Sequence, residues 1–271
     1  MNRGTVNRER GTGGRSPSPV LPALCVVLGL MLLGCRGTLS PLSNRIKVGE
    51  EPFVIFVADG EEGNGDLFAV PAAGGTAFQV TFTRVDESRP ALSPDGSVVA
   101  FARGGLRADA PVSVALLNLV NGAERRINLP QGAGVQRISW SPDGTEIFIR
   151  TAAGTFASAA PPGSPVLHVV PASDAAIADS ALAVLLGNPP FAAAGPCAAG
   201  PGLCALGGSS ETLLDAEGRD PLRWGGDSVA FFVDNSLVVR PLGAGRVRRV
   251  AWSRVPGRPR EASYTPGPAE R

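Results

Sequence analysis

Cysteine and histidine carry much of the covalent and metal chemistry of proteins, and this chain has few of either. Its 271 residues include four cysteines and one histidine, His168. A single imidazole excludes every mechanism that needs two. Cys197 and Cys204 are further apart than the Cys-x2-Cys pairs of zinc sites, and no second pair follows them. We therefore predict no metal and no cofactor. We predict a disulfide between Cys197 and Cys204, with two free buried thiols as the alternative.

The first 34 residues have the layout of a secretory signal. Four arginines and one acid precede an apolar run from Val20 to Leu33. As a helix this run would reach only about 21 Å, whereas a bilayer core is roughly 30 Å thick. The run ends in Leu32-Leu33-Gly34-Cys35, which resembles the bacterial lipobox. That resemblance implies thioether lipidation of Cys35, cleavage after Gly34 and acylation of the new amino terminus. The alternatives are an ordinary signal peptide with a chance cysteine, or an uncleaved anchor helix.

A lipid on Cys35 would hold the mature chain at a membrane. Two or three acyl chains anchor a protein stably, whereas a single chain binds only marginally. Residues 35–45 are polar with Pro and Ser, a composition that predicts a tether. Arg36 stands where an aspartate would imply inner-membrane retention in enteric bacteria. The predicted location is therefore the periplasmic side of the cell envelope, with the outer membrane favoured.

Other candidate groups have structural interpretations. No Gly-x-Ser-x-Gly elbow is present, so that hydrolase signature is absent. The acidic loop from Asp59 to Asp66 has oxygen ligands for Ca²⁺, but their order does not fit the EF-hand template, and we predict a solvated hairpin loop. Arg246, Arg248 and Arg249 are predicted to form the solvent face of a late strand, or to meet an acidic partner or headgroup. The formal net charge of +1 gives no electrostatic footprint for nucleic acid.

The elements that must position these residues repeat along the chain. Three segments, 89–101, 137–149 and 221–233, combine a short strand, a tight turn and a second apolar strand. In such turns Pro presets φ, Asp caps its own backbone and Gly accepts positive φ. Two weaker copies lie at 48–57 and 176–185, and the mean step is about 44 residues, close to a four-stranded propeller blade. The predicted turn residues are Ser93, Pro94, Asp95, Gly96, Ser141, Pro142, Asp143, Gly144 and Asp227.

Each copy continues into a second pair of apolar segments with Gly or Asn between them. The clearest are 66–81, 114–127 and 236–250, and a weaker one is 203–214. In the third unit we place the corresponding strand at 166–171. No stretch of the mature chain shows a long 3.6-residue periodicity, so few helices are expected. The fold class predicted is all-β.

The repeat resembles a known family. Ser-Pro-Asp-Gly before an apolar strand, then Leu-Phe-Ala-Val-Pro at 67–71 and Gly-Gly at 74–75, is similar to the WD40-like (PD40) repeat of TolB-like β-propellers. The resemblance covers residues 46–252 and is poor between 150 and 220. It implies a β-propeller, with two departures from the family pattern. There is no room for the small α/β domain that accompanies the propeller of TolB itself, and five units are recognised instead of six.

The predicted organisation is a signal peptide at 1–34, a tether at 35–45, a TolB-like propeller at 46–252 and a Pro-rich tail at 253–271. We predict a β-propeller of about five four-stranded blades, or six if one is degenerate. The tail is expected to be disordered and to supply no closing strand.

Function follows from the anchor, the ring and the lack of catalytic groups. Propeller loops form a rigid funnel, and binding residues lie on such loops. We predict a non-enzymatic, lipid-anchored binding or scaffold module of the envelope. The family resemblance implies a protein or peptide partner, with a peptidoglycan-associated lipoprotein as the leading candidate. The alternatives are a degenerate spacer, or an envelope hydrolase or lyase acting in the funnel through paired carboxylates such as Asp86, Glu87 or Glu211.

Overall fold

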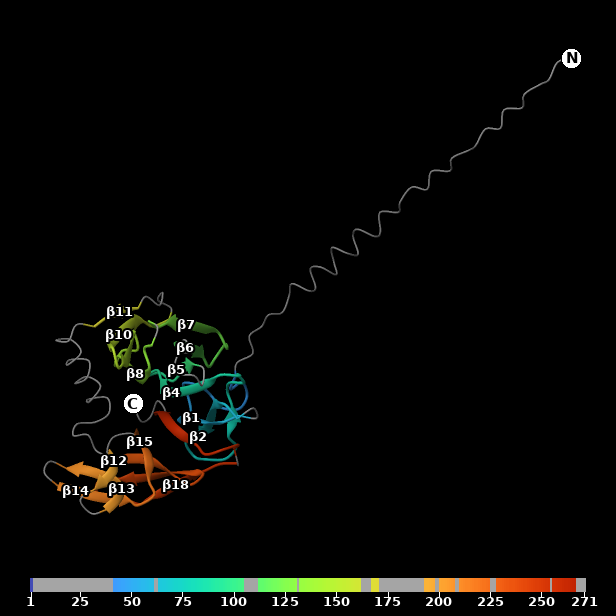
Figure 1. Ribbon diagram of the computed structural model, residues 1–271. Coiled ribbons are helices and arrows are strands. Elements are labelled where there is room, and N and C mark those ends of the chain that lie inside the picture. Colours follow the sequence, from blue (N-terminus) through green and yellow to red (C-terminus); the bar gives the residue numbers. More distant parts are fainter. Residues whose placement is uncertain are drawn as a thin grey trace. The chain divides into compact units, whose positions relative to one another are not determined.

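The computed structural model is drawn in Figure 1, and all its described strands belong to the unit Leu39–Arg271. The residues that the structure describes are 1, 41–60, 63–104, 112–130, 132–161, 167–170, 193–197, 200–207, 210–224, 228–253 and 255–266. Cys25 and Cys35, the predicted signal peptide and most of the predicted tether lie outside these ranges. So do Asp227 and the weak repeat at 176–185.

Within the described ranges, nineteen strands form five antiparallel sheets. The first sheet has the order β19-β1-β2-β3, with β1 Phe53–Asp59, β2 Gly65–Pro71, β3 Phe78–Gln79 and β19 Arg260–Thr265. The second contains β4 Asp86–Leu92, β5 Val98–Gly104, β6 Ser113–Asn118 and β7 Glu124–Asn128. The third contains β8 Val135–Trp140, β9 Glu146–Thr151, β10 Gly154–Ala159 and β11 His168–Val169. The fourth contains β12 Ala193–Cys197, β13 Gly200–Gly207 and β14 Ser210–Asp215. The fifth contains β15 Arg219–Trp224, β16 Ser228–Val233, β17 Ser236–Pro241 and β18 Arg248–Ala251.

The apolar pattern of each strand follows its place in the sheet. The middle strands β1, β5 and β16 are buried along almost their whole length. A strand packed on both faces has no solvent side, so its sequence is a continuous apolar run instead of an alternation. The outer strands β7 and β18 each bury one residue and expose the others. The exposed positions of these two outer strands include Glu124, Arg125 and Arg126 in β7 and Arg248 and Arg249 in β18.

Hydrophobic clusters between sheets join the blades in a row. Phe101 of β5 packs with β1 on one side of the second sheet, and Ala100 packs with Trp140 of β8 on the other side. In the same way the opposite face of β1 packs against Phe232 of the fifth sheet, whose other face packs against Leu203 of the fourth. Figure 1 shows the sheets arranged around a common centre. The prediction of an all-β propeller with several blades is confirmed.

The two Ser-Pro-Asp-Gly turns have the same hydrogen bonds. In the turn before β9, Ser141 Oγ donates to Asp143 Oδ1 at 2.6 Å, and the N–H of Glu146 donates to Ser141 Oγ at 2.9 Å. The turn before β5 repeats both contacts at equivalent positions. Gly144 has φ of 72°, which favours glycine. Each turn is thus held by its own side chains and sets the register of the two strands that it joins.

The Asp143 turn predicts a pH dependence of stability. Hydrogen bonds from Ser141 and Thr145 lower the pKa of Asp143 from 3.8 to about 2. Because the pKa is depressed in the folded state, this carboxylate stabilises the protein above pH 3.8, and the contribution is lost as pH falls through about 2. We expect Asp143→Asn to flatten the slope of unfolding free energy against pH between these values, measured by denaturant titration. An unchanged slope would contradict the assignment.

The first blade is completed by a strand that the sequence did not indicate. β19 pairs with β1 from Phe53–Thr265 to Val57–Arg260, and so supplies the inner strand of the first blade from the far end of the chain. The prediction of a disordered tail is wrong for residues 260–265. The segment was missed because it is polar and flanked by prolines, and only Ala262 and Tyr264 join a hydrophobic cluster. Trp252 packs against that same cluster.

The end of the predicted tether also packs on the propeller. Leu42 is fully buried, and Ile46 is 5% exposed in the cluster between the first two blades. Arg45 lies over the ring of Phe78 at 5.2 Å. The tether prediction is therefore wrong for residues 42–45, since two isolated apolar residues in a polar segment were enough to dock it.

The third and fourth blades differ from the sequence prediction in their strands. The third strand of blade three is β10, which the repeat alignment did not recognise, and the segment predicted at 166–171 provides only the short outer strand β11. His168 is exposed there. In blade four, β12 covers residues 193–197 and β13 covers residues 200–207, so both cysteines lie in strands. Cys204 is buried and disulfide-bonded. The side chain of Cys197 lies outside the described ones, so their pairing stays a prediction.

Candidate functional site

A cavity of about 790 Å³ lies between the inner strands of four blades. Its walls come from β4, β8, β15 and β19, which are the edge strands of their sheets and face the common centre in Figure 1. The charged residues of its lining are Arg89, Arg137, Asp220, Arg223 and Glu261. Leu92, Trp140, Leu222 and Tyr264 contribute apolar surface. A cavity of this size with mixed lining is typical of ligand sites.

Each of the four inner strands contains a β-bulge. The pairing register shifts at Arg89 in β4, Gln136 in β8, Asp220 in β15 and Glu261 in β19. Three of these residues have positive φ: 55° at Arg89, 49° at Asp220 and 45° at Glu261. Left-handed backbone is uncommon for residues other than glycine, and such strain concentrates at functional sites.

The bulges serve the cavity because they re-aim polar side chains. A bulge places an extra residue opposite one partner residue and bends the strand. All four residues at the register shifts line the cavity. Pro90 and Pro221 follow two of them, where the missing N–H of proline costs no ladder hydrogen bond. Charged or polar groups from four blades are therefore directed into one space.

Side chains of neighbouring blades satisfy the free edges of the inner strands. Glu261 Oε2 accepts the N–H of Arg89 at 2.7 Å, and its Oε1 lies 3.2 Å from the Arg89 guanidinium. The N–H of Leu92 donates to Ser263 Oγ at 2.9 Å. On the other side of β4, Trp140 Nε1 donates to the carbonyl of Ala91 at 2.9 Å. These contacts fix the spacing of three blades at the cavity wall.

One hydroxyl at the wall has no hydrogen-bond partner among the described residues. Thr265 is 2% exposed, lines the cavity and leaves its Oγ1 unpaired. A buried polar atom without a partner costs about 1–3 kcal/mol, so such groups are rare and call for an explanation. Next to Thr265, Tyr264 stacks on Trp224 with the ring centroids 4.0 Å apart. The cavity thus offers charge of both signs, aromatic surface and an unpaired hydroxyl.

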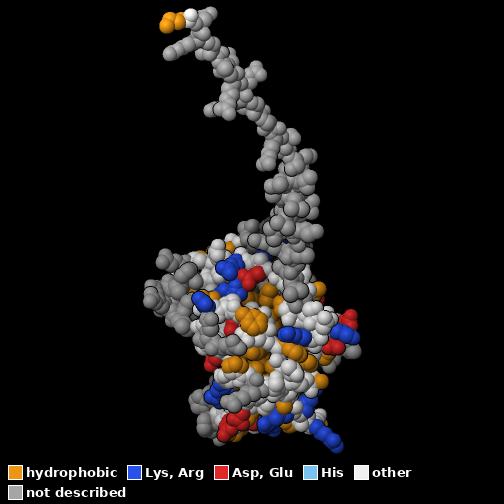
Figure 2. Space-filling view, turned by 90° about the vertical axis from the view of Figure 1, so that its right-hand side faces the viewer, with side chains coloured by type: hydrophobic (Ala, Val, Ile, Leu, Met, Phe, Trp, Pro, Cys, Tyr) orange, Lys and Arg blue, Asp and Glu red, His pale blue; other side chains and the backbone are white. Residues whose placement is uncertain are grey.

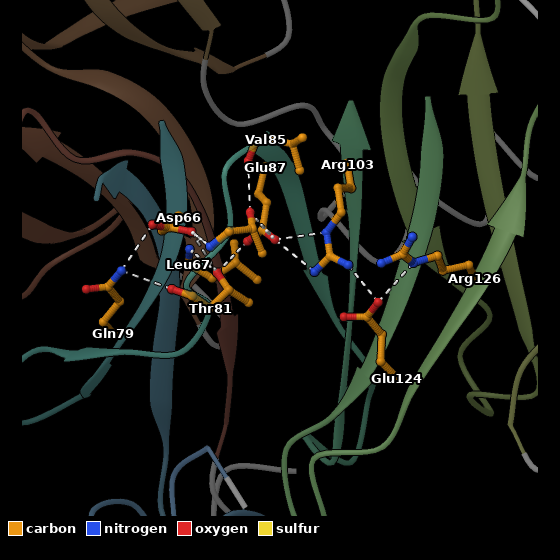
Figure 3. Close-up of polar contacts among 10 residues, drawn as sticks. Asp66, Leu67, Gln79, Thr81, Val85, Glu87, Arg103, Glu124 and Arg126 are labelled. Atoms are coloured by element: carbon orange, nitrogen blue, oxygen red, sulfur yellow. Dashed lines mark hydrogen bonds and ion pairs between the residues drawn. The ribbon is translucent and has the colours of Figure 1, made fainter. Parts of the chain in front are cut away.

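A second polar cluster lies between the first two blades, away from the cavity lining (Figure 3). Glu87 is fully buried, and Arg103 donates to its Oε1 from Nε at 3.0 Å and from Nη2 at 2.9 Å. Thr81 donates to the other oxygen of Glu87. Arg103 Nη1 also contacts Glu124 Oε1 at 2.6 Å. Burial raises the pKa of Glu87, against the hydrogen bond from Thr81 and the charge of Arg103. The network links β4, β5 and β7 and has a structural role.

Of the acids proposed from the sequence for a funnel enzyme, Asp86 and Glu87 do not line the cavity. Glu87 belongs to the buried network, and Asp86 Oδ1 accepts the N–H of Gly65 at 2.8 Å. The side chain of Glu211 lies outside the described ones. The described acids that line the cavity are Asp220 and Glu261, which sequence reasoning missed. A weak sequence signal is that each lies in a polar segment, four residues before Trp224 and Thr265, the last residues of their strands.

The comparisons with known proteins concern the fold. No family model and no curated protein matches the sequence. TolB from Acinetobacter baumannii is similar with a TM-score of 0.42 and 13% identity over 92% of this chain and 73% of that one. A chain of the nidogen/laminin complex has a TM-score of 0.51 and 10% identity, over 80% of this chain and 99% of that one. The periplasmic gluconolactonase PpgL of Pseudomonas aeruginosa has a TM-score of 0.30 and 13% identity over 73% and 67% of the two chains. The similarity to the nidogen/laminin chain, at that low identity, is one of fold alone.

Proposed function

We propose that this protein is a binding module whose cavity takes a segment of a protein or peptide partner. The observation that carries the proposal is the set of bulges at Arg89, Gln136, Asp220 and Glu261, which direct polar groups from four blades into one cavity. Strained backbone persists only where the surrounding structure compensates its cost, and it concentrates at functional sites. Four blades without such a site would not need to repeat the same irregularity.

The lining favours a peptide over a purely apolar ligand. A peptide carries amide groups, charges and apolar side chains at short intervals. Arg137 and Arg223 suit its carboxylates, Asp220 suits its cations, and the Tyr264 ring suits its apolar side chains. The unpaired hydroxyl of Thr265 would gain a backbone partner on binding.

We further propose that the module is lipid-anchored at Cys35 on the periplasmic side of the envelope. The support is the lipobox-like Leu32-Leu33-Gly34-Cys35 after a basic and apolar segment. In the part of the chain that the structure describes, no helix is both long and apolar enough to span a bilayer. Mass spectrometry of the mature amino terminus tests the anchor, and a terminus other than lipidated Cys35 would overturn it.

We propose that the cavity binds without catalysing a reaction. Of its two described acids, Glu261 is engaged by both the backbone and the side chain of Arg89. Paired carboxylates that act as acid and base need to face a substrate from opposite sides. A screen for hydrolase and lyase turnover tests this proposal. Turnover that Glu261→Gln or Asp220→Asn abolishes would favour the enzymatic alternative.

Site-specific photo-crosslinking tests the binding site. Gln136 is exposed within the cavity lining, so a photoreactive residue there should give a discrete adduct with an envelope protein or peptide in cells producing the full chain. Arg137→Glu should reduce that adduct tenfold or more, because reversing a lining charge costs several kcal/mol of binding. Adducts are quantified on blots against the amount of full-length chain.

The matched control carries the photoreactive residue at Asn121, an exposed turn residue outside the cavity lining. It should give no adduct of the same mass. Far-UV circular dichroism of Arg137→Glu shows whether the fold is kept. If the Asn121 position captures the same partner equally, or if Arg137→Glu leaves the Gln136 adduct unchanged in a folded protein, the cavity is not the binding site.

A further inference from the structure

The β17–β18 hairpin of the fifth blade is basic and has an exposed apolar tip. Residues 236–251 contain four arginines and no acid. The tip between the strands, residues 242–247, is exposed throughout, including Leu242 at 42% and Val247 at 57%. Arg246 and Arg249 are exposed beside these aliphatic side chains. We refer to residues 242–249 as the hairpin tip.

The arginines of the hairpin tip have no acidic partner within the described ranges. Arg248 lies over the ring of Trp224 at 5.0 Å, which holds it at the base of the hairpin, and neither Arg246 nor Arg249 is in an ion pair among those residues. Elsewhere the surface mixes charges: Figure 2 shows acidic side chains close to basic ones on the face in view. Among the described residues, Arg246 and Arg249 therefore give the hairpin tip positive charge that no acidic side chain neutralises.

The hairpin tip lies at the same edge of the propeller as the entry of the chain. Arg248 contacts Trp224, Trp224 stacks on Tyr264, and Tyr264 pairs with Val54 at the start of β1. Residues 41–52 reach β1 at this edge. In an antiparallel blade, the turn between the first and second strands lies at the same edge as the turn between the third and fourth strands. β1 is the second strand of its blade, and β17 and β18 are the third and fourth strands of theirs, so the strand order also places the start of β1 and the β17–β18 turn at one edge of the propeller.

The covalent path to Cys35 is short. Leu42 is fully buried against the propeller, so the path from the lipid to a fixed point of the fold is seven residue steps. Fully extended, seven residues span at most about 25 Å. A lipid on Cys35 would therefore hold Leu42, and with it this edge of the propeller, within about 25 Å of the lipid headgroups. A surface so tethered meets the headgroups at high effective concentration.

We propose that the hairpin tip is a membrane-contact surface that binds the phosphates of anionic phospholipids. The proposal rests on the lipid anchor proposed above and assigns the edge of the propeller that faces the bilayer. Arg246 and Arg249 bind the phosphates, while Leu242 and Val247 enter the interfacial region between them. An acidic protein would satisfy the arginines but would not by itself account for two aliphatic side chains exposed at the turn next to the anchored edge.

Hydrogen–deuterium exchange of the mature lipidated protein tests the contact. The full mature chain is bound to vesicles of phosphatidylcholine, alone or mixed with phosphatidylglycerol. We expect amides of residues 242–249 to exchange about tenfold more slowly on the anionic vesicles. The β16–β17 turn at Asp234 and Asn235, at the opposite edge of the same sheet, should exchange equally on both.

A charge variant and a matched control complete the experiment. Arg246→Gln with Arg249→Gln keeps the Arg248–Trp224 contact and should abolish the protection, since each arginine near an anionic surface contributes about a factor of five. Arg258→Gln removes an exposed arginine at the opposite edge, in the β18–β19 connection, and should leave the protection intact.

The outcomes separate this proposal from the anchor. An unmodified mature amino terminus overturns both. A lipidated protein whose hairpin tip exchanges equally on the two kinds of vesicle overturns the membrane contact alone, and the anchor stands. Protection that appears on neutral vesicles only after an envelope protein is added assigns the hairpin tip to an acidic protein and also overturns the membrane contact.

Discussion

A chain that ends after Pro259 is expected to lose the folded propeller at room temperature. The truncation removes β19, which pairs with β1 from Phe53 to Val57 and completes the first blade. It also removes the Tyr264 ring from its stack on Trp224, and the Glu261 and Ser263 side chains that accept N–H groups of β4. Loss of a packed aromatic ring and several hydrogen bonds is worth ~5 kcal/mol or more, comparable with the whole stability of many domains.

The control for this truncation ends the chain after Pro266, so that β19 is kept. Both proteins are compared by thermal unfolding followed by circular dichroism. We expect the chain ending at Pro266 to unfold at the same temperature as the full mature protein, and the chain ending at Pro259 to show no cooperative transition. A cooperative transition within a few degrees of the full protein in the shorter chain would show that β19 is dispensable for closure.

The parts of the fold that repeat could be predicted because local physics determines them. The Ser-Pro-Asp-Gly turns form from their own side chains and need no distant partner, as the matching contacts of Asp95 and Asp143 show. β5, which follows the first of these turns, is apolar on both faces because a neighbouring blade covers each face. Trp140 and Trp224, which end the first strand of their blades, are both buried.

The parts that the sequence did not indicate depend on contacts made across the ring. β19 is polar and short, and it becomes a strand because β1 offers an unpaired edge at the first blade. Leu42 is one apolar residue in a polar segment, and its burial depends on a groove between two blades. The cavity residues Arg89, Asp220 and Glu261 are placed by bulges, which have no strong pattern in a single sequence. Here tertiary structure, and not local preference, decides the conformation.

The buried Glu87–Arg103 pair leads to the second large prediction. Glu87 is 0% exposed, and Arg103 supplies two of the hydrogen bonds that its carboxylate accepts. The same guanidinium reaches Glu124 on β7, so one residue of β5 holds the acids of two other strands. Breaking such a pair by removing one partner leaves a buried charge uncompensated, at a cost of about 3–5 kcal/mol. Arg103→Met keeps much of the side-chain volume and should therefore destabilise the protein by that amount near neutral pH.

The matched control is Arg126→Met, because Arg126 also contacts Glu124 but its side chain is 60% exposed. Exposed ion pairs contribute little, so this variant should lose less than about 1 kcal/mol. In the double variant Arg103→Met with Glu87→Gln, the neutral amide can still contact Thr81, and we expect at least half of the lost stability to return. Equal losses for Arg103→Met and Arg126→Met would show that the buried pair has no special role.

The loss in Arg103→Met should also depend on pH with a defined sign. Burial already raises the pKa of Glu87 from 4.5, and the charge of Arg103 opposes that rise, so removing the charge raises the pKa further. A carboxyl whose pKa is higher in the folded than in the unfolded protein costs no stability at pH values below its unfolded-state pKa, because it is protonated in both states. As pH rises from there through the folded-state pKa, the unfolding free energy falls. We expect the unfolding free energy of Arg103→Met to approach that of the wild type below the ordinary glutamate pKa of 4.5, and to fall increasingly behind it as pH rises towards neutrality. Denaturant titrations across this range give the difference directly. A difference that stays constant with pH would mean that Glu87 remains ionised without Arg103, and that the network is held by packing and not by charge.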